Sequence, residues 1–314
     1  MQYKHISVMI REVLQALNPK PGDNFIDCTL GGAGYTVELA KRVGPEGKVL
    51  SIDLDPMAIE NAKKRLKEEN LNNVILVRDN FKNIREVVQE NWLQGGASFS
   101  GVVLDLGLSS AQLDDRSRGF SFQADTPLKM EFGEGVNSTE EIVNEWREKE
   151  IEKILREYGE EKHAHSIVNA ISEARRKDRI TSTGQLLEII KSAVPTGYTN
   201  QKIHFATRTF QALRMATNGE LENLEKVLPD ALALLKPGGR LVVVSFHSLE
   251  DRIVKEYFKK EGKDCLCPKE APTCHCGHKK QIEIITKKIM APMRDETKMN
   301  PRARSAKLRV AEKL

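Results

Sequence analysis

A glycine-rich turn and an acidic residue near the start of the sequence are of the types that bind an adenosine-containing cofactor. The turn reads D-C-T-L-G-G-A-G at 27–34, between an apolar run and a helical pattern. Glycines there let the backbone approach a ligand closely. Asp53 ends the next apolar run, and a carboxylate about twenty residues after such a turn can accept hydrogen bonds from ribose hydroxyls. A tight structural turn and a solvent-facing Asp are the alternative interpretations.

Three further residues fit the same ligand. Phe81 follows a third apolar run and could pack on an adenine ring, although a core aromatic would show the same pattern. Asp105 ends a fourth apolar run, and Gln112 follows on the next loop. Because the carboxyl ends of parallel strands meet at one edge of a sheet, we expect these side chains to lie near the glycine-rich turn.

Two short patterns bear on the choice between a dinucleotide and S-adenosylmethionine. The G-G-A-G at 31–34 departs from the dinucleotide pattern G-x-G-x-x-G. The L-K-P-G-G-R-L run at 235–241, interpreted as a hairpin before a buried strand, is typical of methyltransferases that use S-adenosylmethionine. We therefore favour the methyl donor.

The residues above need a framework of alternating strands and helices. Apolar runs predict strands at 25–28, 48–53, 74–77, 101–105 and 240–246, with two further candidates at 281–289 and 306–311. Helical patterns lie between the first strands, which implies parallel strands with crossover helices. Only helical patterns occur between about 113 and 215, at 139–157, 161–177 and 183–192, and another helix is predicted at 221–235. The predicted fold is α/β, with one sheet domain at 1–112 and 216–314 and an inserted all-helical substrate-recognition domain at 113–215.

The charge of the chain is unevenly distributed. The 314 residues carry a formal charge of +4, but 279–314 contain eleven basic and four acidic residues. Such a basic segment favours a polyanion partner, with a solvated terminus as the alternative. No stretch approaches the roughly 18 apolar residues of a membrane helix, and the N-terminus lacks a signal-peptide pattern. We therefore expect a cytoplasmic protein with no membrane partner.

Four of the five cysteines crowd into one short segment, beside two histidines. These six residues are Cys265, Cys267, Cys274, His275, Cys276 and His278. A disulfide scaffold does not fit a chain of this size without a signal peptide. The cluster is compatible with a structural zinc ion, yet its C-x-C steps differ from the usual C-x₂₋₄-C spacing. We assign no metal to the active site and leave open whether the cluster binds zinc.

Seven runs along the chain resemble the RsmH (MraW) family of 16S ribosomal RNA cytosine-N4 methyltransferases. They are H-I-S-V-M at 5–9, the turn at 27–34, D-L-G-L-S-S-A-Q-L-D at 105–114, R-G-F-S-F at 118–122, A-T-R-T-F-Q-A-L-R at 206–214, S-F-H-S-L-E-D-R-I-V-K at 245–255 and N-P-R-A-R-S at 300–305. The run at 245–255 is highly specific, and together the runs extend from one end of the chain to the other.

This resemblance implies a class I (Rossmann-like) S-adenosylmethionine-dependent methyltransferase fold with a helical insertion. It implies methyl transfer to N4 of a decoding-centre cytosine, position 1402 in standard 16S numbering, with 16S rRNA in the small ribosomal subunit as partner. The cofactor positions carried over from the family are Ala33, Gly34, Tyr35, Asp53, Phe81, Asp105 and Gln112.

The sequence departs from the family pattern at three places. Tyr35 stands where the family commonly has His, and Thr126 where Gly is usual. The run L-K-M-E-F at 128–132 replaces a common L-D-M-R-M, which reverses two charges, at Lys129 and Glu131. We expect cofactor binding to survive these changes, whereas substrate choice and turnover are open to change.

Asp105 and His247 are the catalytic candidates. The D-L-G-L run at 105–108 stands where many amino-methyltransferases have D/N-P-P-aromatic, so another aromatic must stack on the target: Phe120, Phe122 or Tyr35. We expect Asp105 to position the cofactor and the target amine, and His247 to lie at the edge of the target pocket. A hydrogen-bonded strand-end histidine is the alternative for His247.

Other arginines are candidates for RNA contacts. Arg302, Arg304 and Arg309 are the preferred phosphate contacts. Arg208 is a weaker candidate, for which a surface salt bridge is the alternative.

Two other functions remain open: a diverged paralogue that methylates another RNA amine, and a weakly active S-adenosylmethionine-binding factor in ribosome assembly. The oligomeric state is open as well, a homodimer included.

Overall fold

The chain forms two compact units. The computed structural model describes residues 7–92, 98–122, 124–133, 138–201, 203–268, 271 and 273–314. One unit, the sheet unit, comprises Met1–Ser109 and Leu221–Leu314, and the other, the helical unit, comprises Ser110–Glu220. His5 and Ile6 of the first family motif lie outside the described residues. In the described part of the chain, no helix is long and apolar enough to cross a membrane.

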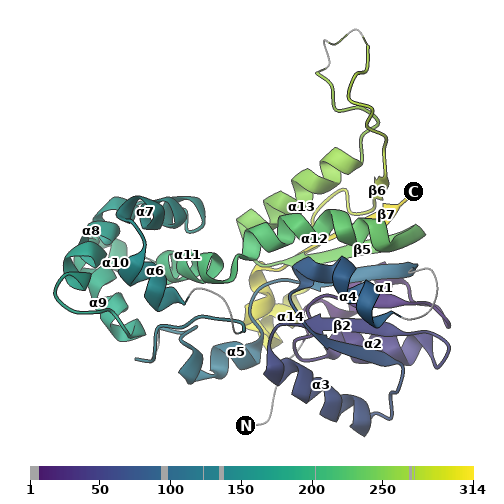
Figure 1. Cartoon of the computed structure of the whole chain (residues 1–314), viewed down its shortest axis with the longest axis horizontal. Coiled ribbons are helices and arrows are strands. Elements are labelled where there is room, and N and C mark those ends of the chain that lie inside the picture. Colours follow the sequence, from purple (N-terminus) through teal and green to yellow (C-terminus); the bar gives the residue numbers. More distant parts are fainter. Residues whose placement is uncertain are drawn as a thin grey trace. The chain divides into compact units, whose positions relative to one another are not determined.

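The sheet unit is built on seven strands in the order β3-β2-β1-β4-β5-β7-β6. Strands β2, β5, β6 and β7 are labelled in Figure 1. Their bounds are β1 Phe25–Asp27, β2 Val49–Asp53, β3 Val74–Arg78, β4 Phe99–Asp105, β5 Leu235–Ser245, β6 Ile282–Ile284 and β7 Lys307–Lys313. Strands β1 to β5 pair in parallel, and β7 runs antiparallel to both β5 and β6. The predicted strands are therefore confirmed, including the two candidates near the C-terminus.

The segment before the buried part of β5 differs from its prediction. Lys236, Pro237, Gly238 and Gly239 fall within the bounds of β5, where a separate hairpin was predicted, but none of the four pairs with β4: Phe99 pairs with Leu235, and Gly101 with Arg240. A Cβ on Gly239 would lie 2.8 Å from the carbonyl oxygen of Lys236 and 2.9 Å from that of Phe99. Glycine is thus needed because the two strands approach closely at the irregularity.

Helices cover both faces of the sheet and bury its apolar residues. On one face lie α4 (Ile84–Asn91), α12 (Glu220–Leu234) and α13 (Ser248–Glu261), packed on β1, β2, β4 and β5. On the other lie α1 (Ile10–Leu17), α2 (Gly34–Val43) and α3 (Pro56–Glu68). Because both faces are covered, the parallel strands are nearly continuously apolar, and functional polar groups are confined to the strand ends.

The basic C-terminal segment is part of the folded sheet unit. After β6 the chain forms α14 (Arg294–Met299), the 3-10 helix η3 (Pro301–Ser305) and β7. Arg309 lies in β7, is 9% exposed, and donates from Nε to Asp251 Oδ1 at 2.7 Å. The prediction that Arg309 contacts phosphate is therefore wrong, because a buried side chain paired within the protein does not reach RNA. Arg302 and Arg304 are exposed, and their role stays a prediction.

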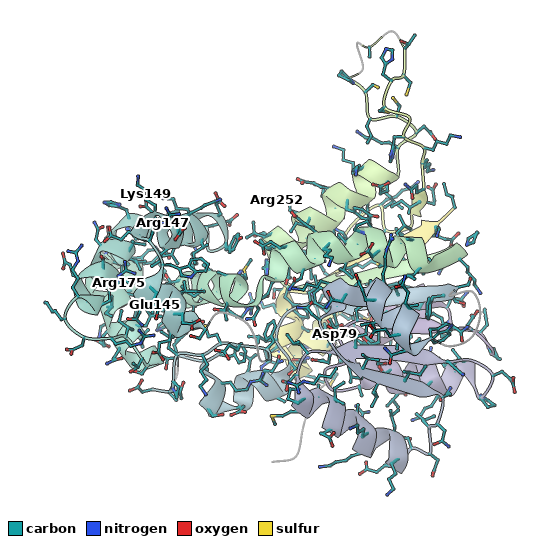
Figure 2. All side chains as sticks on the ribbon, viewed as in Figure 1. Asp79, Glu145, Arg147, Lys149, Arg175 and Arg252 are labelled. Atoms are coloured by element: carbon teal, nitrogen blue, oxygen red, sulfur yellow. The ribbon has the colours of Figure 1, made fainter. Side chains whose placement is uncertain are left out.

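The helical unit contains no strand among its described residues, only an isolated bridge between Pro127 and Ser182. Its helices are α5 Ser110–Asp114, η2 Arg116–Arg118, α6 Thr139–Glu145, α7 Glu148–Glu157, α8 Ala164–Arg175, α9 Thr183–Ala193, α10 Thr196–Thr199 and α11 Thr207–Asn218. The helix predicted at 139–157 is interrupted at Trp146 and Arg147, which are extended. Arg175, labelled on α8 in Figure 2, donates to the carbonyl oxygens of Val143 and Trp146 and so satisfies the end of α6.

Candidate cofactor site at the carboxyl ends of the strands

The loop that follows β1 is held by a buried network. Asp27 is fully buried; its Oδ1 accepts from the Thr29 backbone N–H at 3.2 Å and its Oδ2 from the Thr36 hydroxyl at 2.7 Å. Burial raises the pKa of Asp27 to about 6, against these hydrogen bonds. Thr29 Oγ1 in turn accepts from the backbone N–H of Asp105 at 2.6 Å. The turn after β1 is thereby fixed to the end of β4.

The glycine-rich turn leads directly into the first turn of α2. Ala33 has a positive φ of 60° and caps the helix. At Gly34 a Cβ would overlap the side chain of Ser7, so the N-terminal segment lies directly against the turn. Arg65 of α3 donates to the carbonyl oxygen of Gly32. The predicted pair Ala33 and Gly34 therefore lies where a glycine-rich turn meets a helix N-terminus, a geometry suited to close ligand approach.

Asp53 lies at the end of β2 with its carboxylate turned to the same turn. Its Oδ2 accepts from the Gly31 N–H at 2.8 Å and its Oδ1 from the Asp55 N–H at 2.9 Å. Each oxygen retains acceptor capacity, as recognition of two ribose hydroxyls requires. Burial, and then the charges of Asp55 and Asp27, raise the pKa of Asp53 to about 6. The structure thus brings together the glycine-rich turn and Asp53, the two features from which the cofactor site was predicted.

Phe81 begins a short 3-10 helix, η1 (Phe81–Asn83), directly after β3. Its ring is half-buried and packs against the main core. The preceding Asp79, labelled in Figure 2, accepts from the Asn80 N–H at 2.6 Å and from Asn83 Nδ2 at 2.9 Å. This loop lies beside Asp53, since the Asp79 N–H donates to the Asp53 carbonyl oxygen at 3.2 Å. Both predicted roles of Phe81, core aromatic and adenine contact, are compatible with this half-buried position.

Asp105 at the end of β4 carries a buried oxygen, Oδ1, that has no hydrogen-bond partner among the described residues. Unpaired buried carboxylate oxygens are costly. Burial, followed by the charges of Asp27, Glu250 and Glu296, raises the pKa of Asp105 well above its usual 3.8. Such an atom fits a site that a hydrogen-bond donor or a cation completes.

Two of the acidic residues that raise the pKa of Asp105, Glu250 and Glu296, were not identified from the sequence. Glu250 is 2% exposed in the first turn of α13, and its Oε2 accepts the N–H groups of Phe246 and His247 at 2.8 and 3.3 Å. Glu296 of α14 accepts from the Met9 N–H at 2.6 Å. The spacing of His247 and Glu250 is a helix-start signal that was available. Nothing local marks Glu296, which reaches the site only through the tertiary fold.

His247 forms the N-cap of α13. Its Nδ1 accepts from the Glu250 N–H at 3.3 Å, and its Nε2 lies 3.0 Å from Glu250 Oε1. The side chain is 13% exposed. These contacts give His247 a structural role in starting the helix after β5. Its predicted place at the edge of the target pocket stays a prediction.

Tyr35, the departure from the family pattern, is 2% exposed in the first turn of α2. Its hydroxyl donates to the carbonyl oxygen of Val8. Burial, and then the charge of Asp105, raises the pKa of Tyr35 well above 10. The phenol is therefore neutral and tied to the N-terminal segment, an arrangement that does not favour it as the aromatic stacking on a target base.

The remaining predicted residues lie in the helical unit. Gln112 is buried in α5. Phe120 stacks on Phe132 with ring centroids 5.6 Å apart, and Phe122 stacks on His204 at 4.6 Å. Arg208 donates to the Tyr198 hydroxyl at 3.3 Å. Their roles towards cofactor, base and RNA stay predictions.

Comparison with known proteins identifies the family. The model of the MraW methylase family matches residues 2–314. The chain belongs to this family. Proteins named "Ribosomal RNA small subunit methyltransferase H" from Brevibacillus brevis and Clostridium botulinum (strain Kyoto / Type A2) are 44% and 45% identical to it over 315 aligned residues. The alignments cover all of this chain and 99% and 100% of those two proteins.

Membership of the MraW methylase family accounts for the arrangement of the sheet unit. The parallel order β3-β2-β1-β4-β5, extended by the antiparallel pair β7 and β6, is that of a Rossmann-like class I methyltransferase. In such a fold the ligand lies at the carboxyl ends of the strands, next to the point between the parallel strands β1 and β4 where the strand order changes direction. Asp53 and Asp105 occupy those strand ends, and S-adenosylmethionine is the methyl donor that their surroundings fit.

Proposed function

We propose that this protein transfers a methyl group from S-adenosylmethionine to the exocyclic N4 of a cytosine in 16S rRNA of the small ribosomal subunit, at position 1402. Two findings support the substrate: the full-length identity to relatives named for small-subunit rRNA methylation, and the seven motifs of the sequence. The observation that carries the chemistry is the unpaired, buried Oδ1 of Asp105 at the strand edge.

The donor fits the residues present. Asp53 would accept hydrogen bonds from the ribose hydroxyls, the backbone at Ala33, Gly34 and Tyr35 would approach the amino-acid part, and Phe81 would pack on the adenine ring. When bound, S-adenosylmethionine supplies an activated methyl group on a sulfonium cation. The carboxylates near Asp105 favour that charge over the neutral thioether left after transfer.

Asp105 has the position and the electrostatics to act on the target amine. A cytosine amine is a weak nucleophile because its lone pair is delocalised into the ring, so orientation must supply much of the rate. The base must also leave its stack to reach a buried site. Oδ1 of Asp105 would accept one N–H of the amine and hold the nitrogen in line with the methyl group. The same carboxylate would be placed to take the surplus proton that the amine carries after methylation, with water as the other acceptor.

The test uses small subunits that lack the modification, labelled methyl donor and nucleoside analysis. We expect label on N4-methylcytidine with the wild-type protein. Asp105→Ala is expected to lower turnover at least about 100-fold while the protein stays folded. Asp295→Ala, an exposed carboxylate beside Glu296 on α14, is the matched control and should leave turnover unchanged. Absence of label from cytosine N4 would refute the substrate assignment, and wild-type turnover of Asp105→Ala would refute the role of Asp105.

A further inference from the structure

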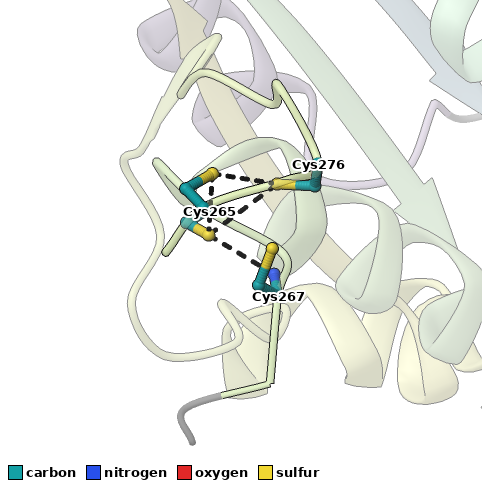
Figure 3. Close-up of side chains that lie close together, drawn as sticks. Cys265, Cys267 and Cys276 are labelled. Atoms are coloured by element: carbon teal, nitrogen blue, oxygen red, sulfur yellow. Dashed lines mark hydrogen bonds between the residues drawn. The ribbon is translucent and has the colours of Figure 1, made fainter. Parts of the chain in front are cut away.

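The four clustered cysteines converge at one point in the segment between α13 and β6 (Figure 3). The Sγ atom of Cys265 lies 3.4 Å from that of Cys274 and 3.7 Å from that of Cys276, and Cys274 and Cys276 are 3.6 Å apart. All four sulfur atoms, including that of Cys267, lie within 4.8 Å of one another. All four are free thiols.

These separations match a tetrahedral thiolate site. Zinc binds thiolate sulfur at about 2.3 Å in tetrahedral geometry, which places neighbouring sulfurs about 3.8 Å apart. The sulfurs come from two C-x-C steps on opposite sides of the loop, 265–267 and 274–276. Two C-x-C steps thus place four sulfur atoms around one point, as C-x₂₋₄-C steps do in most zinc sites.

Backbone N–H groups point at the sulfurs, as they do around thiolates. Leu266 donates to Cys276 Sγ at 3.3 Å, Cys267 to Cys265 Sγ at 3.4 Å, and His275 to Cys267 Sγ at 3.3 Å. Hydrogen bonds of this kind favour the charged form of the ligand and fix its direction. Three of the four sulfurs are therefore already oriented by the loop backbone.

The described residues of the surrounding loop form no apolar interior that would hold it. No described residue from 262 to 280 is buried. Two contacts with the end of α13 close the base of the loop. The Gln281 N–H donates to the Glu261 carbonyl oxygen at 2.8 Å, and His278 Nε2 lies 3.1 Å from the Lys260 carbonyl oxygen. Short segments without a core need a covalent or metal cross-link to keep one conformation.

We propose that Cys265, Cys267, Cys274 and Cys276 bind one structural zinc ion. Four protein ligands leave no open coordination position, so the site orders the loop and takes no part in methyl transfer. The two nearby histidines are not ligands. His275 Nε2 lies 2.9 Å from the Thr273 hydroxyl, and His278 is engaged with the end of α13.

The first experiment measures zinc in the full-length protein, purified with reductant and without added chelator. We expect about one zinc per chain in the wild type and at least a tenfold loss in Cys267→Ser and Cys274→Ser. His275→Ala is the matched control, because it removes a potential ligand from the same loop, and should keep its zinc. Wild-type zinc below about a tenth of an equivalent after incubation with Zn²⁺ would overturn the proposal, as would equal loss in His275→Ala.

Two measurements on the wild type keep the proposal testable if the cysteine variants do not fold. Zinc released by stepwise thiol modification should appear only as the four loop cysteines react. Cobalt-loaded protein should show the intense visible and thiolate charge-transfer absorption of a tetrahedral sulfur site. Iron in place of zinc in the isolated protein, or two disulfides by mass in freshly prepared chains, would contradict a zinc site.

Discussion

Asp105 illustrates how a residue that is unfavourable in the free protein can serve a cationic ligand. Its ionised form is disfavoured by burial and by the charges of Asp27, Glu250 and Glu296. A sulfonium bound nearby would reverse that balance, because opposite charges favour ionisation and like charges oppose it. After the methyl group has left, the sulfur is neutral, and this favourable interaction between the carboxylates and a positive charge is lost. At the scale of residues, we therefore expect the proposed site to bind the methyl donor more tightly than the product.

This electrostatic arrangement predicts a pH dependence of cofactor binding. The pKa values of Asp27 and Asp53 are about 6 in the folded protein, above the usual 3.8. Between pH 3.8 and about pH 6 these two carboxyl groups bind more protons in the folded chain than in the unfolded chain. The free energy of unfolding therefore falls as pH rises through this range. A cation favours the ionised carboxylates, so affinity for S-adenosylmethionine should rise between about pH 5 and pH 7, with release of protons.

Calorimetry in buffers of different ionisation enthalpy measures both the affinity and the proton release. Asp53→Asn keeps the shape of the side chain but cannot ionise, and should flatten the pH profile while weakening binding about tenfold, the loss expected for a charge-assisted hydrogen bond. An affinity that is constant or falls with rising pH would show that these carboxylates do not respond to the ligand charge.

Sequence reasoning found the strand-end residues but not the groups that set their electrostatics. Asp53 and Asp105 were predictable because each ends an apolar run, and strand ends of a parallel sheet share one edge. Glu296 could not be found in this way, since its link to Met9 joins opposite ends of the chain. Arg309 was misjudged for the same reason: its partner, Asp251, lies on α13 and is distant in sequence.

At the scale of elements, periodicity identified strands and helices well but not where they are interrupted. The helix predicted at 139–157 is divided at Trp146, where the Arg175 guanidinium donates to the last carbonyls of α6 and Glu150 accepts the backbone N–H of Arg147 at the start of α7. The glycines at 238–239 were interpreted as a turn before the strand, although both lie within β5, where Phe99 closely approaches Gly239. At both places a segment distant in sequence contacts the interruption.

The close approach of the N-terminal segment to the glycine-rich turn predicts the effect of a single methyl group. In Gly34→Ala the new Cβ would overlap the Ser7 side chain, so either the turn or the N-terminal segment must move. We expect a stability loss of about 1–3 kcal/mol and weaker cofactor binding. Gly197→Ala in α10, where a Cβ meets nothing within 4 Å, is the matched control. Thermal unfolding and cofactor titration compare the two, and equal behaviour would contradict the packing argument.

At the scale of the whole molecule, the C-terminal segment combines a structural and a proposed RNA-binding role. Removing residues 300–314 would delete β7, which pairs with both β5 and β6, so weaker RNA binding by such a truncation would report unfolding. Substituting the exposed Arg302 and Arg304 of η3 is a cleaner test. The residue between them, Ala303, is buried and anchors η3 to the core, so these substitutions leave that anchor in place.

We therefore predict that Arg302→Gln combined with Arg304→Gln weakens binding to the small subunit and leaves affinity for S-adenosylmethionine unchanged. Each lost phosphate contact should reduce the slope of log affinity against log salt by about 0.7–0.9, so the double variant should lose about 1.4–1.8 from that slope. Lys298→Gln on the preceding helix, an exposed lysine beside Asp295, serves as the matched single-charge control. An unchanged salt slope in the double variant would show that RNA is bound elsewhere on the protein.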